Sequence, residues 1–84
     1  MIDSYKLFFT QACPNCPKVK EHMNSLNIRG EHLDAGSDQG IQEARKYNIM
    51  SVPTVVFFDH NNSEVSRAQS VEEIKRMTEN KTLL

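Results

Sequence analysis

Residues 5–20, YKLFFTQACPNCPKVK, join a short apolar stretch to two closely spaced cysteines and then to a charged stretch. The stretch Tyr5–Phe9 is rich in aromatic residues and bounded by polar ones, which predicts a buried strand. After Pro17, three apolar residues recur at helical spacing: Val19, Met23 and Leu26. Polar residues fill the positions between them, which predicts an amphipathic helix that ends near Asn27. The cysteines therefore lie between a strand and a helix.

The two cysteines of the chain, Cys13 and Cys16, enclose Pro14 and Asn15. If the helix begins within CPNCPK, Cys13 lies at or just before its N-terminus and Cys16 one turn later, close enough for the sulfurs to bond. Free amides and the positive end of the helix dipole favour the thiolate, which is the nucleophile in exchange. Pro14 and Pro17 can occupy the first turn, where a missing N–H removes no intrahelical bond. We expect Cys13 to attack a partner disulfide and Cys16 to resolve the mixed disulfide.

Two other interpretations of the cysteine pair stay open. It can be half of a metal or cluster site, with His22, His32, His60 or carboxylates as further ligands, although none of the histidines has clear ligand spacing and we expect all three to be solvated. The chain can also be a binding module that uses its groove without turnover. We favour redox exchange, with no metal.

The remaining chain predicts five more elements. Ile28–Asp34 is a second strand, and Ser37 and Asp38 begin a second helix that ends at Asn48. The β-branched and aromatic stretch Thr54–Asp59 predicts a central strand buried on both faces.

The turn HNN and the stretch SEVSRA then complete a hairpin. Ser70 and Glu73 form a capping box for a last helix, whose buried stripe is Val71, Ile74 and Met77. Strands joined by a helix favour a parallel crossover and the hairpin is antiparallel, so we expect a mixed sheet covered by helices. Residues 1–84 are expected to form a single domain.

Composition limits the partners. The 84 residues are 38% hydrophobic and 25% charged, with ten Lys and Arg against eleven Asp and Glu, which is typical of a soluble domain and gives no support to nucleic-acid binding. The start, MIDSYKLFF, resembles neither a signal peptide nor a membrane span, so we expect a cytoplasmic protein. In a reducing cytosol the cysteine pair is not expected to form a permanent structural disulfide. Lys18 and Lys20 are expected on a solvated face, with Lys18 adding some positive potential near Cys13.

CPNC after an apolar strand, together with YNIMSVPT at residues 47–54, resembles the thioredoxin and glutaredoxin superfamily. The resemblance covers nearly the whole chain in element order and implies the α/β thioredoxin-like fold, a four-stranded mixed sheet with three helices (βαβαββα). It implies that Pro53 is cis and faces the cysteines, and that Val52, Pro53 and Thr54 bind substrate. Pro14 and Asn15 then belong to the active-site loop, and Asn48 stands where the pattern usually has Gly.

The sequence departs from the typical thioredoxin and glutaredoxin patterns at three places. Ala12 replaces the Trp that precedes the first cysteine of typical thioredoxins, and the stretch LFF has no equivalent of their buried Asp. The stretch SRAQSVEE lacks the Gly-Gly and Asp with which glutaredoxins hold glutathione. The chain thus resembles small glutaredoxin-like redoxins that behave like thioredoxins, including those that serve ribonucleotide reductase.

The resemblance implies an enzyme, a protein-disulfide oxidoreductase that takes part in electron transport and cell redox homeostasis. Its expected partners are a disulfide-containing protein and a reductase such as thioredoxin reductase, with glutathione less favoured. We expect a monomer that needs no cofactor beyond the reversible Cys13–Cys16 disulfide and that binds neither nucleic acid nor membrane.

Overall fold

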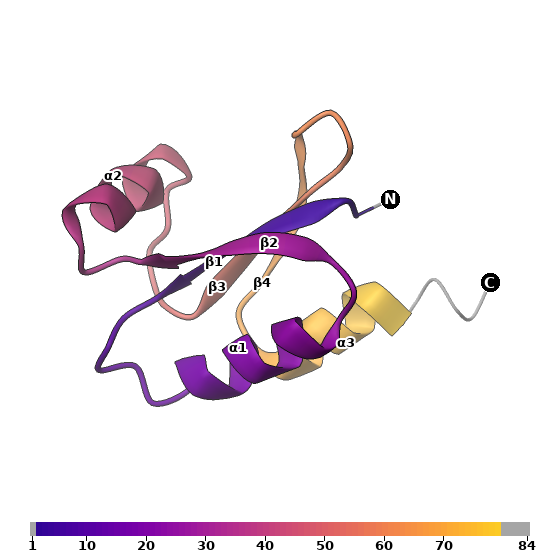
Figure 1. Ribbon diagram of the computed structural model, residues 1–84, viewed down its shortest axis with the longest axis horizontal. Helices are drawn as coiled ribbons and strands as arrows, with labels where there is room; N and C mark the ends of the chain where they lie inside the picture. The colour runs from indigo at the N-terminus through magenta and orange to yellow at the C-terminus, as the bar shows by residue number, and fades with distance from the viewer. Residues whose placement is uncertain (1, 80–84) are drawn as a thin grey trace.

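A computed structural model describes residues 2–79 of the chain. Its elements follow the predicted order and are shown in Figure 1: β1 (Ser4–Phe9), α1 (Cys16–Ser25), β2 (Arg29–Asp34), α2 (Asp38–Lys46), β3 (Thr54–Phe58), β4 (Glu64–Ala68) and α3 (Val71–Glu79). No helix in this part of the chain is both long and apolar enough to cross a membrane.

The four strands form one mixed sheet in the order β2-β1-β3-β4. β1 pairs with β2 in parallel, as the crossover through α1 predicts, whereas β3 is antiparallel to both β1 and β4. Every residue of β3 is buried, which confirms the prediction of a central strand covered on both faces. The register places Phe9 opposite Asp34 and Phe8 opposite Thr54. The end of β1, the end of β2 and the start of β3 therefore meet at one end of the sheet.

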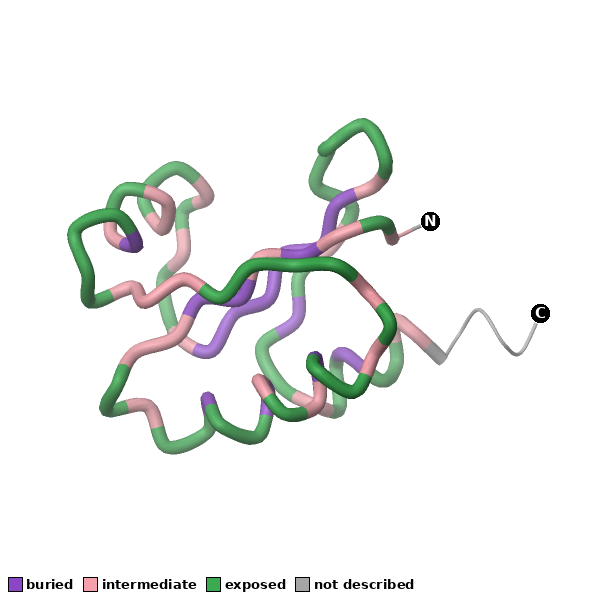
Figure 2. The backbone as a smooth tube through the Cα atoms, in the orientation of Figure 1, coloured by how far each residue is buried: buried purple, intermediate pink, exposed green. Residues whose placement is uncertain are grey.

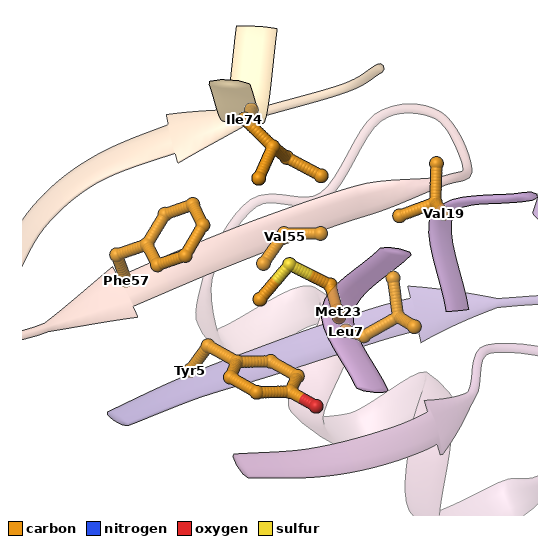
Figure 3. Close-up of a cluster of buried hydrophobic side chains, with 8 residues drawn as sticks. Tyr5, Leu7, Val19, Met23, Val55, Phe57 and Ile74 are labelled. Carbon is orange, nitrogen blue, oxygen red and sulfur yellow. The ribbon is translucent and has the colours of Figure 1, made fainter. Parts of the chain in front are cut away.

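The sheet separates two apolar clusters. On one face, α1 and α3 lie side by side and cover a cluster that includes Leu7, Met23 and Ile74 (Figures 1 and 3). On the other face, α2 covers a smaller cluster built around Phe8 and Val56. Figure 2 shows burial concentrated in the central strands, while β2 exposes most of its length. The helices thus cover both faces, as the apolar stripes predict.

The expected helix ends are present, with one difference in detail. Ser37 caps α2 by accepting a hydrogen bond from the Gly40 N–H at 3.1 Å, and Asn48 has the left-handed φ of 55° that closes this helix. At α3, the Glu73 N–H donates to Ser70 Oγ at 3.2 Å, whereas the Glu73 carboxylate accepts from the Gln69 N–H at 2.6 Å. The capping box therefore reaches back one residue further than in its usual form.

Candidate active site

The cysteine pair lies at the sheet end where three segments converge. β1 delivers the chain into the loop of residues 10–15, β2 ends in the turn at Asp34, and the segment before β3 contains Val52 and Pro53. The Ala35 N–H donates to the Phe9 carbonyl at 2.7 Å and the Gln11 side-chain amide donates to the Asp34 carboxylate at 3.3 Å. The first bond continues the pairing of β1 with the chain after β2, and the second fastens the cysteine loop to the end of β2.

Cys13 and Cys16 are joined by a disulfide, with their Cα atoms 5.4 Å apart. Cys16 is the first residue of α1 and only 1% exposed, whereas Cys13 lies three residues earlier and is half-buried. The helix therefore begins at Cys16 and not near Cys13, where the sequence places its start. Of the two prolines, only Pro17 occupies its first turn. Pro14 is an exposed loop residue ahead of the cap.

At the N-terminus of α1, neither a capping side chain within residues 2–79 nor an acidic residue of the first turn offsets the positive end of the helix dipole. Asn15 occupies the N-cap position, but its side chain makes no capping bond with the described residues, and the first turn contains no acidic residue. Unpaired amides and the helix dipole at this position stabilise a negative charge. Both sulfurs adjoin this end, so the local chemistry favours a cysteine thiolate when the disulfide is reduced.

The segment before β3 supplies a buried proline and a partly open backbone. The Val52–Pro53 peptide bond is cis, which confirms that part of the expectation for Pro53. Pro53 and Thr54 are buried and Val52 is half-buried. The Thr54 hydroxyl donates to the Ser51 carbonyl at 2.7 Å, and the Gln69 amide donates to Ser51 Oγ at 3.4 Å. The register brings this segment to the end of the sheet that carries the cysteines, whereas contact between Pro53 and the sulfurs stays a prediction.

A shallow hollow of about 550 Å³ adjoins this segment on the α2 side. Its lining is mainly apolar and consists of Ala35, Ile41, Ala44, Arg45, Asn48, Ile49, Met50, Ser51 and Val52. Met50 is 92% exposed, which is unusual for a large apolar side chain. Met50 precedes Pro53 by three residues, and this exposed side chain lies at the rim of the hollow.

Two side chains of α1 differ from the solvated state expected for them, and the first is His22, whose Nε2 is buried without a hydrogen-bond partner among the described residues. His32 is exposed, as expected, and its Nε2 lies 3.1 Å from the Tyr5 hydroxyl. Lys20 packs its ammonium on the Phe9 ring. His60 is exposed, as predicted. Across residues 2–79, no three His, Cys, Asp or Glu side chains gather in a way that could hold a metal ion.

Sequence reasoning missed Asp34 and Gln11 as parts of this site. Asp34 Oδ1 also accepts the Gly36 N–H at 2.8 Å, so one carboxylate shapes the turn after β2 and holds the cysteine loop. The available signal was an Asp at the end of a predicted strand, two residues before a Gly. Asp in that position forms such turns frequently.

Comparisons with a family model and with a related protein both point to thioredoxins. Residues 4–79 match a family model described as a thioredoxin domain. A protein of Archaeoglobus fulgidus described as a probable thioredoxin is 33% identical over 58 residues. That alignment spans 64% of this chain and 64% of the relative, so the chain matches somewhat less than two thirds of the relative's length.

Solved structures agree in fold. Oxidized thioredoxin O2 from Arabidopsis thaliana has a TM-score of 0.79 at 17% identity, covering 98% of this chain and 75% of that one. Thioredoxin 1 from Thermosipho africanus has a TM-score of 0.74 at 21% identity, covering 95% and 94%. At such identities the likeness establishes the fold, with its four-stranded mixed sheet and three helices.

Proposed function

The chain belongs to the thioredoxin domain family, and from that membership we propose that it is a thiol–disulfide oxidoreductase that reduces protein disulfides through Cys13 and Cys16. The observation that carries the proposal is the disulfide between a half-buried cysteine and a fully buried one at an uncapped helix N-terminus. Both sulfurs are within bonding reach, and only one of them is open to a partner.

The reaction proceeds in two thiol–disulfide exchanges, each of which consumes one thiolate and releases another. The Cys13 thiolate attacks a sulfur of the partner disulfide, so one Cys13–partner S–S bond forms, the partner S–S bond breaks and a partner thiolate leaves. The Cys16 thiolate then attacks the Cys13 sulfur, which closes the Cys13–Cys16 disulfide and expels the second partner thiolate. The partner gains two electrons and the cysteine pair loses two. A dithiol reductant must return them before the next cycle.

Exposure supports the order of these steps. Cys16 is 1% exposed, so an external disulfide reaches it poorly, whereas half-buried Cys13 is accessible. Once Cys13 is in the mixed disulfide, the adjacent Cys16 acts as an intramolecular nucleophile, which gives it a high effective concentration. Pro14 and Asn15 form the exposed rim of the loop across which the partner approaches.

The partner segment binds beside Val52, Pro53 and Thr54 in this proposal. Val52 is half-buried next to a cis bond, and its backbone N–H and C=O can pair with an extended segment as a short added strand. The neighbouring hollow, with Met50 at its rim, offers apolar contact to side chains of that segment. The substrate is thus a protein with an accessible disulfide on an extended stretch.

We further propose that electrons come from a thioredoxin reductase rather than from glutathione, and that the protein acts as a cytoplasmic monomer with no cofactor other than its disulfide. The residues after β4 support this choice of reductant. The stretch SRAQSVEE, residues 66–73, contains none of the glycines that let a glutathione backbone approach in glutaredoxins.

The test of the reaction uses variants of the two cysteines. Cys16→Ser should accumulate a mixed disulfide with a model disulfide protein, because Cys13 attacks and nothing resolves the adduct. Cys13→Ser should form no such adduct. Non-reducing gel electrophoresis and intact mass measure both. Faster alkylation of Cys16 than of Cys13 in the reduced wild-type protein would reverse the assigned roles.

The test of the reductant compares two coupled assays on the same disulfide substrate. One uses NADPH with thioredoxin reductase, and the other uses NADPH with glutathione and glutathione reductase. We expect faster turnover in the first. Faster turnover with glutathione, or saturable tight binding of glutathione, would remove this part of the proposal and leave the cysteine chemistry in place.

A further inference from the structure

Lys20 lies one helical turn beyond Cys16, and its ammonium rests on an aromatic ring beside the cysteine loop. Its Nζ is 3.4 Å from the centroid of the Phe9 ring, and both side chains are half-buried. We propose that Lys20 is a positioning residue of the redox pair, whose fixed charge favours the thiolate form of Cys13. This inference rests on the proposed function in one respect: it assumes that the Cys13–Cys16 disulfide is reduced during the cycle.

Helix geometry places Lys20 on the face of α1 that also carries Cys16. Residues four apart lie on the same helix face, so Cys16 and Lys20 are neighbours on α1. Long helical side chains slant toward the helix N-terminus, which for Lys20 is the turn that begins with Cys16. Phe9 is the last residue of β1, where the chain enters the cysteine loop. The contact with Phe9 therefore holds the ammonium at the sheet end that carries the sulfurs.

The packing keeps the charge in place and limits screening. A cation on an aromatic face is attracted by the ring, which restricts the motion of a flexible lysine. A half-buried charge is screened less by salt than a fully exposed one. A nearby cation lowers the pKa of a cysteine thiol because it stabilises the thiolate. β1 offers no competing anion, since its residues are SYKLFF.

The charge of Lys20 acts on at least one other titrating group here. The pKa of His32 on β2 is lowered, first by burial and then by repulsion from Lys20. Asp34, the acid at the end of β2, already accepts bonds from the Gln11 amide and the Gly36 N–H. Tyr5 on β1 has its pKa raised by burial and stays neutral. Asp34 keeps its negative charge, but among residues 2–79 no ion pair joins Lys20 to an acid of β1 or β2.

Apart from Lys20, the Lys, Arg and Glu side chains described on α1 and α3 are exposed. α1 itself carries exposed Lys18 and Glu21. α3, which packs beside α1, places apolar Ile74 in the shared cluster. The charged side chains of α3 that lie within the described residues are all exposed: Glu72, Glu73, Lys75 and Arg76. Lys20 is therefore the half-buried cation of α1, and Lys18 provides a matched exposed lysine on the same helix.

The test measures the thiol pKa of Cys13 directly, in a Cys16→Ser background in which a single thiol titrates. The rate of alkylation by iodoacetamide, a neutral reagent, is followed from pH 5 to pH 10. Lys20→Met keeps an unbranched apolar stem over Phe9 but removes the charge. It should raise the pKa of Cys13 by about half a unit to one unit, which lowers the thiolate fraction below that pKa about 3- to 10-fold.

Three companion variants separate charge from packing. Lys20→Arg should retain most of the wild-type pKa, because it keeps the charge on the ring. Lys18→Met should change the pKa much less than Lys20→Met. Phe9→Leu, which removes the ring but not the lysine, should give a smaller rise, and its effect should disappear when Lys20→Met is already present. Thermal unfolding checks that each variant is folded.

Equal pKa values for wild type and Lys20→Met would overturn the proposal, as would equal shifts from Lys18→Met and Lys20→Met or a full shift in Lys20→Arg. These readouts need no disulfide substrate and no reductase. A chain that failed to reduce proteins would still show the shift if Lys20 acts as proposed, and an active chain without the shift would refute Lys20 alone.

Discussion

Cys13 and Cys16 are separated by two residues, yet the fold gives them different surroundings. Cys16 begins a helix and lies on its buried face with Val19 and Met23, and it is 1% exposed. Cys13 belongs to the preceding loop and keeps access to solvent. The sequence predicted this division from spacing and the expected helix start. It could not place the start at Cys16, because Pro14 and Pro17 both suit a first helical turn.

His32 gives a residue-scale prediction about pH. Its pKa is lowered by burial and by Lys20, whereas in the unfolded chain it stays near 6.5. Below about pH 6.5 the unfolded state therefore binds more protons than the folded state, so stability is lost as the pH falls through the folded pKa. When the His32 ring is neutral, its Nε2 can also accept a hydrogen bond from the Tyr5 hydroxyl.

His32→Gln should flatten the fall in the free energy of unfolding between pH 7 and pH 5, measured by urea denaturation at fixed ionic strength. His60→Gln is the matched control, because His60 is exposed in the hairpin turn, and it should leave the slope unchanged. An unchanged slope in His32→Gln would show that the neutral ring contributes no stability.

At the scale of elements, the close approach of α2 to the end of β2 depends on Gly40. A Cβ on Gly40 would overlap the backbone carbonyl of Asp34. That carbonyl cannot move cheaply, since it accepts the Ser37 N–H at 3.0 Å and the Ser37 hydroxyl at 2.7 Å. Ser37 in turn caps α2. One glycine thus allows the turn, the cap and the helix to pack together.

Two effects oppose each other in Gly40→Ala. Alanine gains about 1 kcal/mol of helix propensity over glycine, whereas forcing a methyl group into a packed site costs about 1–3 kcal/mol or more. Because the overlap is with backbone, we expect the clash to win and urea denaturation to show a lower free energy of unfolding. Gln42→Ala, at an exposed position of α2, should be neutral or slightly stabilising. A more stable Gly40→Ala would mean that α2 can shift freely.

A second element-scale prediction concerns the ion pair that ties β1 to α2. Lys6 Nζ lies 2.8 Å from Glu43 Oε1, and the side chains are 22% and 26% exposed. Their hydrogen bond is the main cause of a lowered pKa for Glu43 and a raised pKa for Lys6. The stabilisation is thus present between the two unfolded pKa values. It is lost as the pH falls through the pKa of Glu43 or rises through that of Lys6.

A double-mutant cycle of Lys6→Met and Glu43→Gln should give a coupling of about 0.5–1 kcal/mol at pH 7. The coupling should fall toward zero as the pH drops through the lowered pKa of Glu43, and it should weaken in high salt. A coupling that does not fall on acidification and does not weaken in high salt would indicate packing rather than charge.

The element order could be predicted from the sequence because each element carries a local signal. The cap at Ser37 and the left-handed Asn48 appear where local chemistry places them, and the strand predicted over residues 54–59 is observed over Thr54–Phe58. The contacts between elements could not be predicted in the same way. Lys20 on Phe9 and Gln11 on Asp34 join residues that pattern alone leaves on solvated faces or in loops. Their partners become known only when the register of β1 and β2 is fixed.

At the scale of the whole molecule, one end of the sheet carries the proposed chemistry and the rest supports it. β1 and β3 are central strands that contribute to both apolar clusters, through Leu7 and Phe57 on one face and through Phe8 and Val56 on the other. A domain of this size has a total stability of about 4–13 kcal/mol. Each cluster therefore holds a large share of the total, and neither face is expected to stay folded without the other.

The two tyrosines allow this expectation to be measured, since the chain has no tryptophan. Tyr5 lies in the cluster under α1 and α3, whereas Tyr47 packs against the cluster under α2. Tyr47→Phe leaves Tyr5 as the reporter of one face, and Tyr5→Phe leaves Tyr47 as the reporter of the other. In each variant, urea unfolding followed by tyrosine fluorescence should coincide with unfolding followed by far-ultraviolet circular dichroism.

Core truncation completes the test of one cooperative domain. Met23→Ala and Phe8→Ala remove side chains with no exposed area from opposite faces, and each should cost about 2–5 kcal/mol. Because β1 is shared, Phe8→Ala should move the transition reported by Tyr5 as much as the one reported by Tyr47. Val65→Ala, at a position 45% exposed on β4, should move both much less. Separate transitions on the two faces would show that the sheet does not couple them, and that the residues around the cysteines can open while the α2 side stays folded.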